Sequence, residues 1–187
     1  MLIGYALCGS FCTIGRSIEE MEKLTSAGHE LLPIMSVNAY TTDTRFGMAD
    51  EVNRKIAKVC GKKIIHTIDA AEPLGPKVKL DMLVIAPCTG NTLAKIAHGI
   101  TDTAVTMAAK AHLRSDRPLV IALASNDALS ANLANLAVML MRKNVYVVPL
   151  HQDDPVKKPH SLVAEFGLIP DAIDAALRGE QLRPLFL

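Results

Sequence analysis

Short, continuous apolar runs alternate along the chain with longer stretches in which apolar residues recur every three or four positions. Six runs predict strands, at residues 2–7, 31–36, 64–65, 82–86, 119–123 and 145–148. Five stretches predict helices, at residues 14–24, 52–59, 93–98, 104–113 and 129–140, with a further short helix near the C-terminus. Because the strand runs are continuous, we expect both faces of the sheet to be covered. Alternating strands and helices of this kind predict an α/β fold, a doubly wound parallel sheet of about six strands.

The chain reads as one domain, residues 1–187, because no repeat, charge block or Gly/Ser-rich linker divides it. An irregular loop is expected at 70–79, which contains Pro73, Gly75 and Pro76. The segment 151–187 begins with a polar stretch that holds three prolines and ends in an apolar tail. We expect this segment to pack on the functional site or on a neighbouring protomer.

Composition narrows the class of partner. Lys plus Arg is 20 and Asp plus Glu is 19, a net charge of +1, which leaves no phosphate-neutralising surface for nucleic acid. No segment has the roughly 18 apolar residues of a membrane span, and no secretion signal is recognisable, so a cytoplasmic protein is expected. Half the residues are hydrophobic and the mean hydropathy is +0.25, which favours a homo-oligomer that buries apolar surface between its protomers.

Cysteine and histidine residues give no sign of a metal site. The four cysteines form no C-x-x-C pair, and we interpret them as buried, reduced thiols: Cys8, Cys12, Cys60 and Cys88. No two histidines stand four residues apart on a predicted helix, and no metal is predicted. The leucine stripe at 129–140 and the eight methionines are interpreted as core.

In a parallel sheet, ligands bind at the carboxyl ends of the strands, so the loops that follow the strands are the candidate site. Gly9, Ser10 and Thr13 follow the first strand, where a glycine, two hydroxyls and a helix N-terminus together suit a phosphate. An ordinary turn in which Ser10 or Thr13 caps the helix explains this loop equally well. Ser36 and Asn38 follow the second strand.

Two further loops add hydroxyl and amide groups to the same edge. Residues 87–92 read Pro-Cys-Thr-Gly-Asn-Thr, and Ser125, Asn126 and Asp127 follow the strand at 119–123. Four such loops would form a bowl of neutral hydrogen-bonding groups, which suits a phosphorylated heterocycle such as flavin mononucleotide (FMN). Neither G-x-G-x-x-G nor G-x-x-x-x-G-K-[ST] is present, so the chain has no recognisable nicotinamide or ATP loop.

Several segments resemble those of known flavoproteins. Residues 87–102 resemble the flavin-binding segment of the family that contains the flavin-dependent cysteine decarboxylases and the flavin prenyltransferases. Four other segments resemble a narrower family, the B subunits of dipicolinate synthases: residues 42–47, 71–77, 125–129 and 152–159. This second resemblance covers nearly the whole chain.

The resemblance implies a flavodoxin-like, Rossmann-like chain that binds FMN, associates with itself and works with a separate A subunit that carries NADP. The implied reaction is the oxidation of dihydrodipicolinate to dipicolinate in the mother cell of a spore-forming bacterium. Gly9, Ser10 and Phe11 would line the phosphate end of the flavin. Ser36 would add a hydroxyl, and the remaining cofactor contacts would come from Cys88, Thr89, Gly90, Asn91 and Ser125.

A dicarboxylate substrate requires cationic groups. Arg45, in the loop after the second strand, could bind a carboxylate through two hydrogen bonds, and Lys157 and Lys158 could contact the second carboxylate. A solvated charge explains all three residues as well, and a salt bridge between protomers explains Arg45. No residue is assigned to proton transfer.

Two other functions stay open at this stage. One is a flavin prenyltransferase or decarboxylase that acts alone; against it, the prenyltransferases carry an arginine where Ser125 stands here, and a tyrosine without a counterpart between Val148 and Pro159. The other is a non-catalytic, FMN-binding scaffold protein.

Overall fold

The continuous apolar runs form the middle of a parallel sheet in the computed structural model, which describes all 187 residues. Five parallel strands follow the order β2-β1-β3-β4-β5 across the sheet. Their bounds are β1 Leu2–Leu7, β2 Glu30–Met35, β3 Met82–Cys88, β4 Leu119–Ser125 and β5 Val145–Val147. Every residue of β3 and β4 is buried, as continuous runs require. The predicted doubly wound α/β fold is confirmed.

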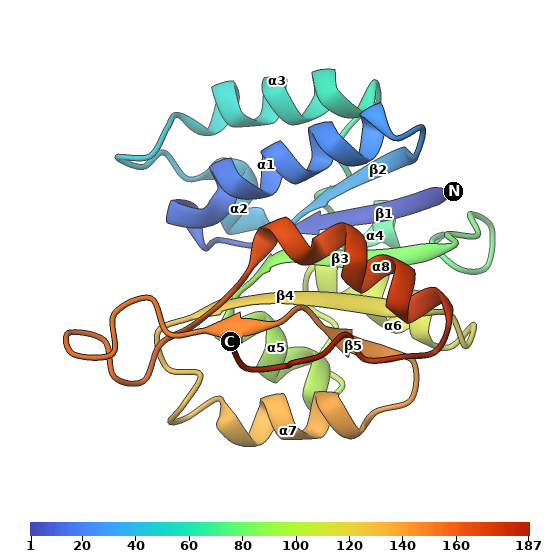
Figure 1. Cartoon of the computed structure of the whole chain (residues 1–187). Coiled ribbons are helices and arrows are strands. Elements are labelled where there is room, and N and C mark those ends of the chain that lie inside the picture. The colour runs from blue at the N-terminus through green and yellow to red at the C-terminus, as the bar shows by residue number, and fades with distance from the viewer.

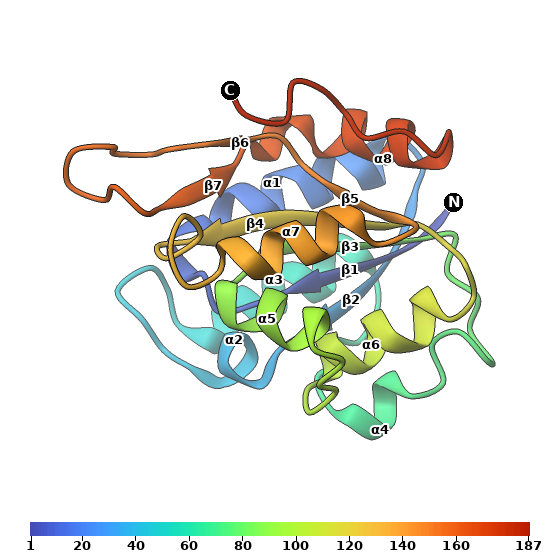
Figure 2. The ribbon, with the colours of Figure 1, turned by 90° about the horizontal axis from the view of Figure 1, so that it is seen from below.

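Helices cover both faces of the sheet (Figures 1 and 2). One face carries α1 Phe11–Ser26, α3 Ala49–Cys60 and α8 Ile169–Leu177, with the 3-10 turn η1 Phe166–Leu168 before α8. The other face carries α5 Gly90–Ala97, α6 Ala104–Leu113 and α7 Leu133–Met141. Two short helices complete the fold, α2 Val37–Thr41 after β2 and α4 Ile68–Ala71 beside α6. No helix is both long enough and apolar enough to cross a membrane.

The outer edge of β4 is shared by two partners. Residues Leu119 to Ile121 pair in parallel with β5, whereas Ala124 and Ser125 pair antiparallel with β7, Leu162–Ala164. β7 in turn pairs with β6, Leu150–His151. The sheet therefore has seven strands, and β6 and β7 were not predicted. Conversely, the expected strand at 64–65 is a single bridge between Ile65 and Ile34, because only that pair meets the edge of β2.

The leucine stripe at 129–140 is only partly core. α7 begins at Leu133 rather than Leu129, because residues 126–132 form turns in which the Asp127 carbonyl accepts from the Ser130 and Asn132 N–H groups. Leu136 and Met139 are buried, but three large apolar residues of α7 are exposed: Leu133, Val138 and Met141. Met1 and Met48 are exposed as well, so the prediction that all methionines are core is wrong for three of the eight.

A buried polar contact fixes α1 against β1 and β3. The Tyr5 hydroxyl lies 3.1 Å from Ser17 Oγ, and Ser17 Oγ donates to the Ala86 carbonyl at 2.5 Å. Burial raises the pKa of Tyr5 far above its ordinary value, so its hydroxyl stays neutral. Each such buried hydrogen bond contributes about 1 kcal/mol to stability, and losing one partner costs more. These bonds hold the middle of α1 against the end of β3, near the candidate site.

Candidate functional site

A cavity of about 580 Å³ opens where β1 and β3 end side by side. α1 leaves β1 toward one face of the sheet and α5 leaves β3 toward the other, so the two loops separate at this point (Figure 1). Ligands of doubly wound proteins bind at such a switch point. The volume is that of a small-molecule site. Five chain segments line the cavity: Gly9 to Thr13, Phe46, Thr89 to Asn91, Ala124 to Asp127, and Asp153, Lys158, Ser161 and Val163 of the C-terminal part.

The structure brings eight of the twelve predicted cofactor and substrate residues to this cavity: Gly9, Ser10, Phe11, Thr89, Gly90, Asn91, Ser125 and Lys158. Ser36 lines an adjoining hollow of about 280 Å³ that shares Gly9, Phe11, Thr89 and Asn91 with the main cavity. Cys88 is fully buried and does not line either space. Arg45 and Lys157 are exposed outside the cavity.

The loop from β1 to α1 leaves a helix N-terminus available. Ser10 is the N-cap of α1 but makes no side-chain capping bond. Instead, Thr13 Oγ1 donates to the Ser10 carbonyl at 2.8 Å and lies 3.0 Å from Ser10 Oγ. The first N–H groups of a helix carry partial positive charge and need an acceptor. The cap predicted as the alternative is therefore not formed, and this end of the cavity suits an anion.

The loop from β3 to α5 is shaped by Thr89 and Gly90. Thr89 Oγ1 accepts from the Thr92 N–H at 3.2 Å and so caps α5. A Cβ atom on Gly90 would lie 2.5 Å from Ser125 Oγ, 2.6 Å from Asn132 Nδ2 and 2.8 Å from Asp127 Oδ1. Only glycine leaves room here for the polar side chains that follow β4.

Those side chains form a hydrogen-bonded chain, the Asp127 network: Ser125, Asp127, Asn132 and Asn135. Ser125 Oγ donates to Asp127 Oδ1, and Asn132 Nδ2 donates to Asp127 Oδ2 at 2.8 Å. Asn135 Nδ2 donates to Asn132 Oδ1 at 2.9 Å. The network ties the end of β4 to α7 and gives both oxygens of the Asp127 carboxylate a donor.

The C-terminal segment forms one wall of the cavity. Lys158 Nζ lies 2.5 Å from Asp153 Oδ2, and the hydrogen bond from Lys158 lowers the pKa of that carboxyl. Arg16 Nη2 on α1 lies 2.8 Å from Glu165 Oε1, which ties α1 to the chain after β7. The polar stretch that begins segment 151–187 thus lies against the loops at the ends of β1 and β4.

Six lining residues were not predicted for the site: Cys12, Phe46, Ala124, Asp153, Ser161 and Val163. Phe46 and Asp153 fall in the segments 42–47 and 152–159 that resemble a known family, which is the sequence signal that could have placed them. The prediction that Cys12 is buried is wrong, because the second residue of α1 points outward beside the cavity. Cys8 and Cys88 are buried, as expected, and burial raises the pKa of Cys8 to about 11.

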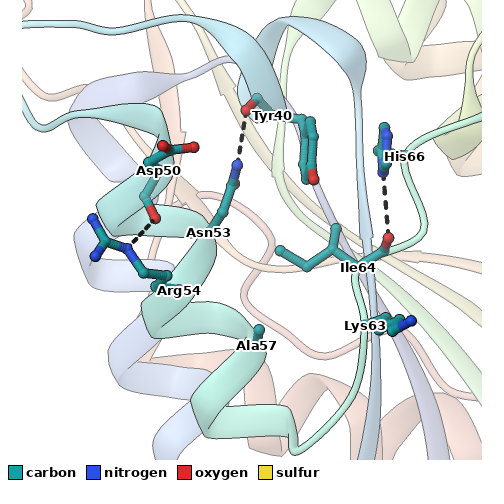
Figure 3. Close-up of a pocket in the computed structure, with 8 residues that line it drawn as sticks. All are labelled: Tyr40, Asp50, Asn53, Arg54, Ala57, Lys63, Ile64 and His66. Atoms are coloured by element: carbon teal, nitrogen blue, oxygen red, sulfur yellow. Dashed lines mark hydrogen bonds between the residues drawn. The ribbon is translucent and has the colours of Figure 1, made fainter.

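A larger but shallower hollow, of about 650 Å³, lies between α3 and residues 63–66 (Figure 3). The rings of Tyr40 and His66 stack there with centroids 3.8 Å apart. Asn53 Nδ2 donates to the Tyr40 carbonyl, whereas Arg54 Nε donates to the Asp50 carbonyl of its own helix. The Arg54 guanidinium thus lies on the side of α3 away from Tyr40, so the charged groups diverge rather than converge on a ligand. The cavity at the strand ends is the better candidate.

The fold and this cavity together define a class of protein. A parallel sheet of order 2-1-3-4-5 with a polar cavity at the β1/β3 switch point is the arrangement of flavodoxin-like proteins, which place FMN there. The chain belongs to the flavoprotein family, whose model, described as "Flavoprotein", matches residues 2–173.

Similar proteins narrow this class. The chain is 44% identical over 185 residues to the B subunit of dipicolinate synthase from Bacillus subtilis (strain 168), across 99% of this chain and 92% of the relative. The crystal structure of the dipicolinate synthase B subunit from Bacillus halodurans C has a TM-score of 0.91 at 41% identity and covers 100% of this chain and 95% of its own. A dodecameric FMN-dependent UbiX-like decarboxylase from Escherichia coli O157:H7 matches 80% of each chain, with a TM-score of 0.66 at 26% identity.

Proposed function

We propose that this chain binds FMN and serves as the B subunit of an enzyme that oxidises dihydrodipicolinate to dipicolinate. The observation that carries the proposal is the 44% identity to a dipicolinate synthase B subunit over 92% of that relative's length. The cavity at the switch point supports it, because it offers a small-molecule volume and neutral hydrogen-bonding groups where flavodoxin-like proteins bind their cofactor.

The residues that line the cavity fit FMN. The uncapped N-terminus of α1, with Ser10 beside it, provides N–H groups and a hydroxyl for the phosphate. At the other side, Asn91 and Ser125 present an amide and a hydroxyl suited to the polar edge of the ring system. The absent side chain of Gly90 keeps the space between these two groups open.

The chemistry requires that the substrate lose two electrons and two protons as its ring becomes aromatic. Bound FMN would supply an acceptor for the two electrons, whether they stay on it or continue to a nicotinamide. The chain's own part is to bind and orient: Lys158 lines the cavity and could contact one carboxylate of the substrate. Arg45, which lies over the Phe46 ring at 4.9 Å on the adjacent loop, is the candidate for the second carboxylate.

The proposal includes two partners. The Bacillus subtilis relative is by its name one of at least two kinds of subunit, which implies a second chain. We propose that this A subunit carries NADP, because the present chain lacks a G-x-G-x-x-G loop. We also propose that the chain associates with itself, as the dodecameric decarboxylase does.

Two measurements on the purified chain test the proposal. The first is titration with FMN, followed by the change in flavin absorbance and fluorescence. The second is reconstitution with an A subunit, NADP and dihydrodipicolinate, followed by the formation of dipicolinate. Saturable FMN binding together with product that requires both chains is the expected result. Product formed by the A chain without this one, or with this chain free of flavin, would contradict a role for the cofactor.

A second candidate function is that of an enzyme acting alone on flavin or on a carboxylated peptide. The structural similarity to the FMN-dependent UbiX-like decarboxylase favours it. Turnover of dimethylallyl phosphate with reduced FMN, by the isolated chain, would support this candidate. A non-catalytic FMN-binding scaffold is distinguished by anaerobic addition of dihydrodipicolinate, which would then leave the absorbance of the bound flavin unchanged.

A further inference from the structure

One hydroxyl oxygen of the Asp127 network, Ser125 Oγ, makes a single hydrogen bond, to Asp127 Oδ1, and belongs to a residue that lines the cavity. Ser125 lines the cavity, and its side chain is nearly buried. An ionised carboxylate has only acceptors, so the contact between Ser125 Oγ and Asp127 Oδ1 consumes the hydroxyl proton of Ser125. What remains on Ser125 Oγ is a pair of acceptor sites.

The rest of the network sets the orientation of each member. Asn132 Oδ1 is taken by the Asn135 amide, so Asn132 must present its Nδ2 donor to Asp127 Oδ2. Each oxygen of the Asp127 carboxylate therefore accepts one hydrogen bond, and the two bonds together hold the carboxylate in place. Asn132 is buried and Gly90 packs against all three polar groups, which prevents the side chains from turning away.

We infer that Asp127 is a positioning residue: it holds the Ser125 hydroxyl as an acceptor, so that the cavity selects a hydrogen-bond donor of the flavin at this point. The inference rests on the proposed FMN site and deepens it. FMN offers such donors in its ring N3–H and its ribityl hydroxyls, whereas a ring carbonyl placed here would face a second acceptor. A buried acceptor that faces another acceptor makes no hydrogen bond, and this weakens binding. The site therefore selects a hydrogen-bond donor at Ser125.

A double-mutant cycle on FMN binding tests the inference. Ser125→Ala removes the acceptor. In Asp127→Asn, Asn132 Nδ2 takes the one side-chain oxygen left at position 127, so the new amide NH2 faces Ser125 Oγ and donates to it. Each single variant is expected to raise the FMN dissociation constant about tenfold. Because Asp127 acts through Ser125, Asp127→Asn should add no further loss in the Ser125→Ala background. If Asp127 merely stabilised the loop, the two losses would multiply instead.

An exchange of groups within the network provides a rescue. In the double variant Asp127→Asn with Asn132→Asp, the new carboxylate at position 132 accepts from the new amide at position 127, whose oxygen again accepts from Ser125. FMN affinity should return to within about threefold of the starting protein, since the number of hydrogen bonds is restored. Asp174→Asn, the same chemical change at an exposed site on α8, is the matched control and should leave binding unchanged.

Each outcome of the cycle either supports or overturns the role of Asp127. Unchanged FMN affinity in Asp127→Asn or in Ser125→Ala, or losses that multiply, would overturn the inference while leaving the FMN site standing. If Asp127→Asn does not fold, as circular dichroism would show, Ser125→Ala and the exchanged double variant still test the acceptor role. Failure of the unmodified chain to bind FMN would overturn the proposed function, and this inference with it.

Discussion

Most side chains that line the cavity are neutral, and its anion-binding end depends on main-chain N–H groups. The ionisable groups there are Cys12, Asp127, Asp153 and Lys158, of which Asp153 and Lys158 pair with each other and Asp127 is held by two donors. Such a lining binds through the geometry of its hydrogen bonds rather than through net charge. Single-residue changes should therefore affect binding by altering donors, acceptors and space.

Cysteine reactivity gives a first prediction. Cys12 is exposed beside the cavity, whereas burial raises the pKa of Cys8 to about 11 and of Cys60 to about 12, and Cys88 is fully buried. Because the thiolate is the reactive form, one thiol per native chain should react rapidly with Ellman's reagent, and all four should react after unfolding. Saturating FMN should slow the rapid phase, and Cys12→Ser should abolish it. Rapid labelling of two or more thiols in the native chain would contradict this assignment.

Gly90→Ala gives a second prediction at this scale. The added methyl group would collide with Ser125 Oγ, Asn132 Nδ2 and Asp127 Oδ1, which cannot move without breaking their own bonds. We expect the free energy of unfolding to fall by about 1–3 kcal/mol and FMN affinity to fall with it. Urea denaturation and FMN titration measure the two effects.

Gly15→Ala is the matched control for this substitution. Gly15 lies within α1 and has no atom within 4 Å of an added Cβ. Alanine there should raise stability by about 0.5–1 kcal/mol and leave the Asp127 network intact. If Gly90→Ala and Gly15→Ala lost equal amounts of unfolding free energy, the lack of space beside Gly90 would not be the cause of the loss.

Among the elements, the five parallel strands were predictable from their continuous apolar runs, whereas the short antiparallel strands β6 and β7 were not. A run such as 119–123 can only be a strand covered on both faces, and it became β4. β7 has three residues and exists because it pairs with the end of β4, a long-range contact that leaves no local pattern. The helix expected from 129 begins four residues later for a similar reason, since the Asp127 carbonyl bonds turn the chain before α7.

The candidate site was likewise predictable only in part. The loops that follow β1, β3 and β4 could be placed together from topology alone, because parallel strands end at one edge. Lys158 lines the cavity and its neighbour Lys157 does not, a difference that depends on how one polar loop folds back. Phe46 likewise arrives from a loop whose path the local sequence does not encode.

The last turn of α6 contains a histidine that should link stability to pH. His112 is buried, its Nε2–H donates to the Pro118 carbonyl at 2.9 Å, and burial lowers its pKa. Between the folded and unfolded pKa values, the unfolded chain therefore binds more protons than the folded one. The free energy of unfolding should fall as the pH drops below about 6.5, the ordinary pKa of histidine.

The measurement is urea denaturation across this range. His112→Gln, which retains a donor for the Pro118 carbonyl, should reduce the dependence on pH, whereas His160→Gln at an exposed site should not. Carboxyl groups with lowered pKa, such as Asp102 and Asp153, act at more acidic pH and do not confuse the result. If the free energy of unfolding depended on pH equally in His112→Gln and in the unmodified chain, the role assigned to this histidine would be contradicted.

On the scale of the whole molecule, the outer surface of α7 is unusually apolar. The helix has no charged residue, and it lies on the outside of the fold below α5 in Figure 1. Met141 is 79% exposed, with Val138 and Leu133 also exposed on the same helix. Apolar surface of this kind typically marks contact between protomers, in line with the proposed self-association.

Substitution on this face tests that assignment. Glutamate at both Val138 and Met141 should convert the oligomer expected for the unmodified chain into smaller species, because burying two carboxylates in a contact is costly. Light scattering coupled to gel filtration measures the mass. Leu177→Glu, at an exposed apolar position of α8 on the other face, is the control and should retain the oligomer. A mass equal to one protomer for the unmodified chain would contradict the proposal.

The divided edge of β4 has a consequence for how the molecule opens. The strand end that carries Ser125 has Leu162 as its backbone partner, and the same C-terminal stretch is held to α1 by the Arg16–Glu165 ion pair. Detachment of β7 would therefore break the backbone pairing at the end of β4 and loosen the start of the Asp127 network at the same moment. The end of β4 at the cavity and β7, nearly forty residues farther along the chain, should thus exchange their amide hydrogens as one cooperative unit. A bound ligand should slow the exchange of both segments together.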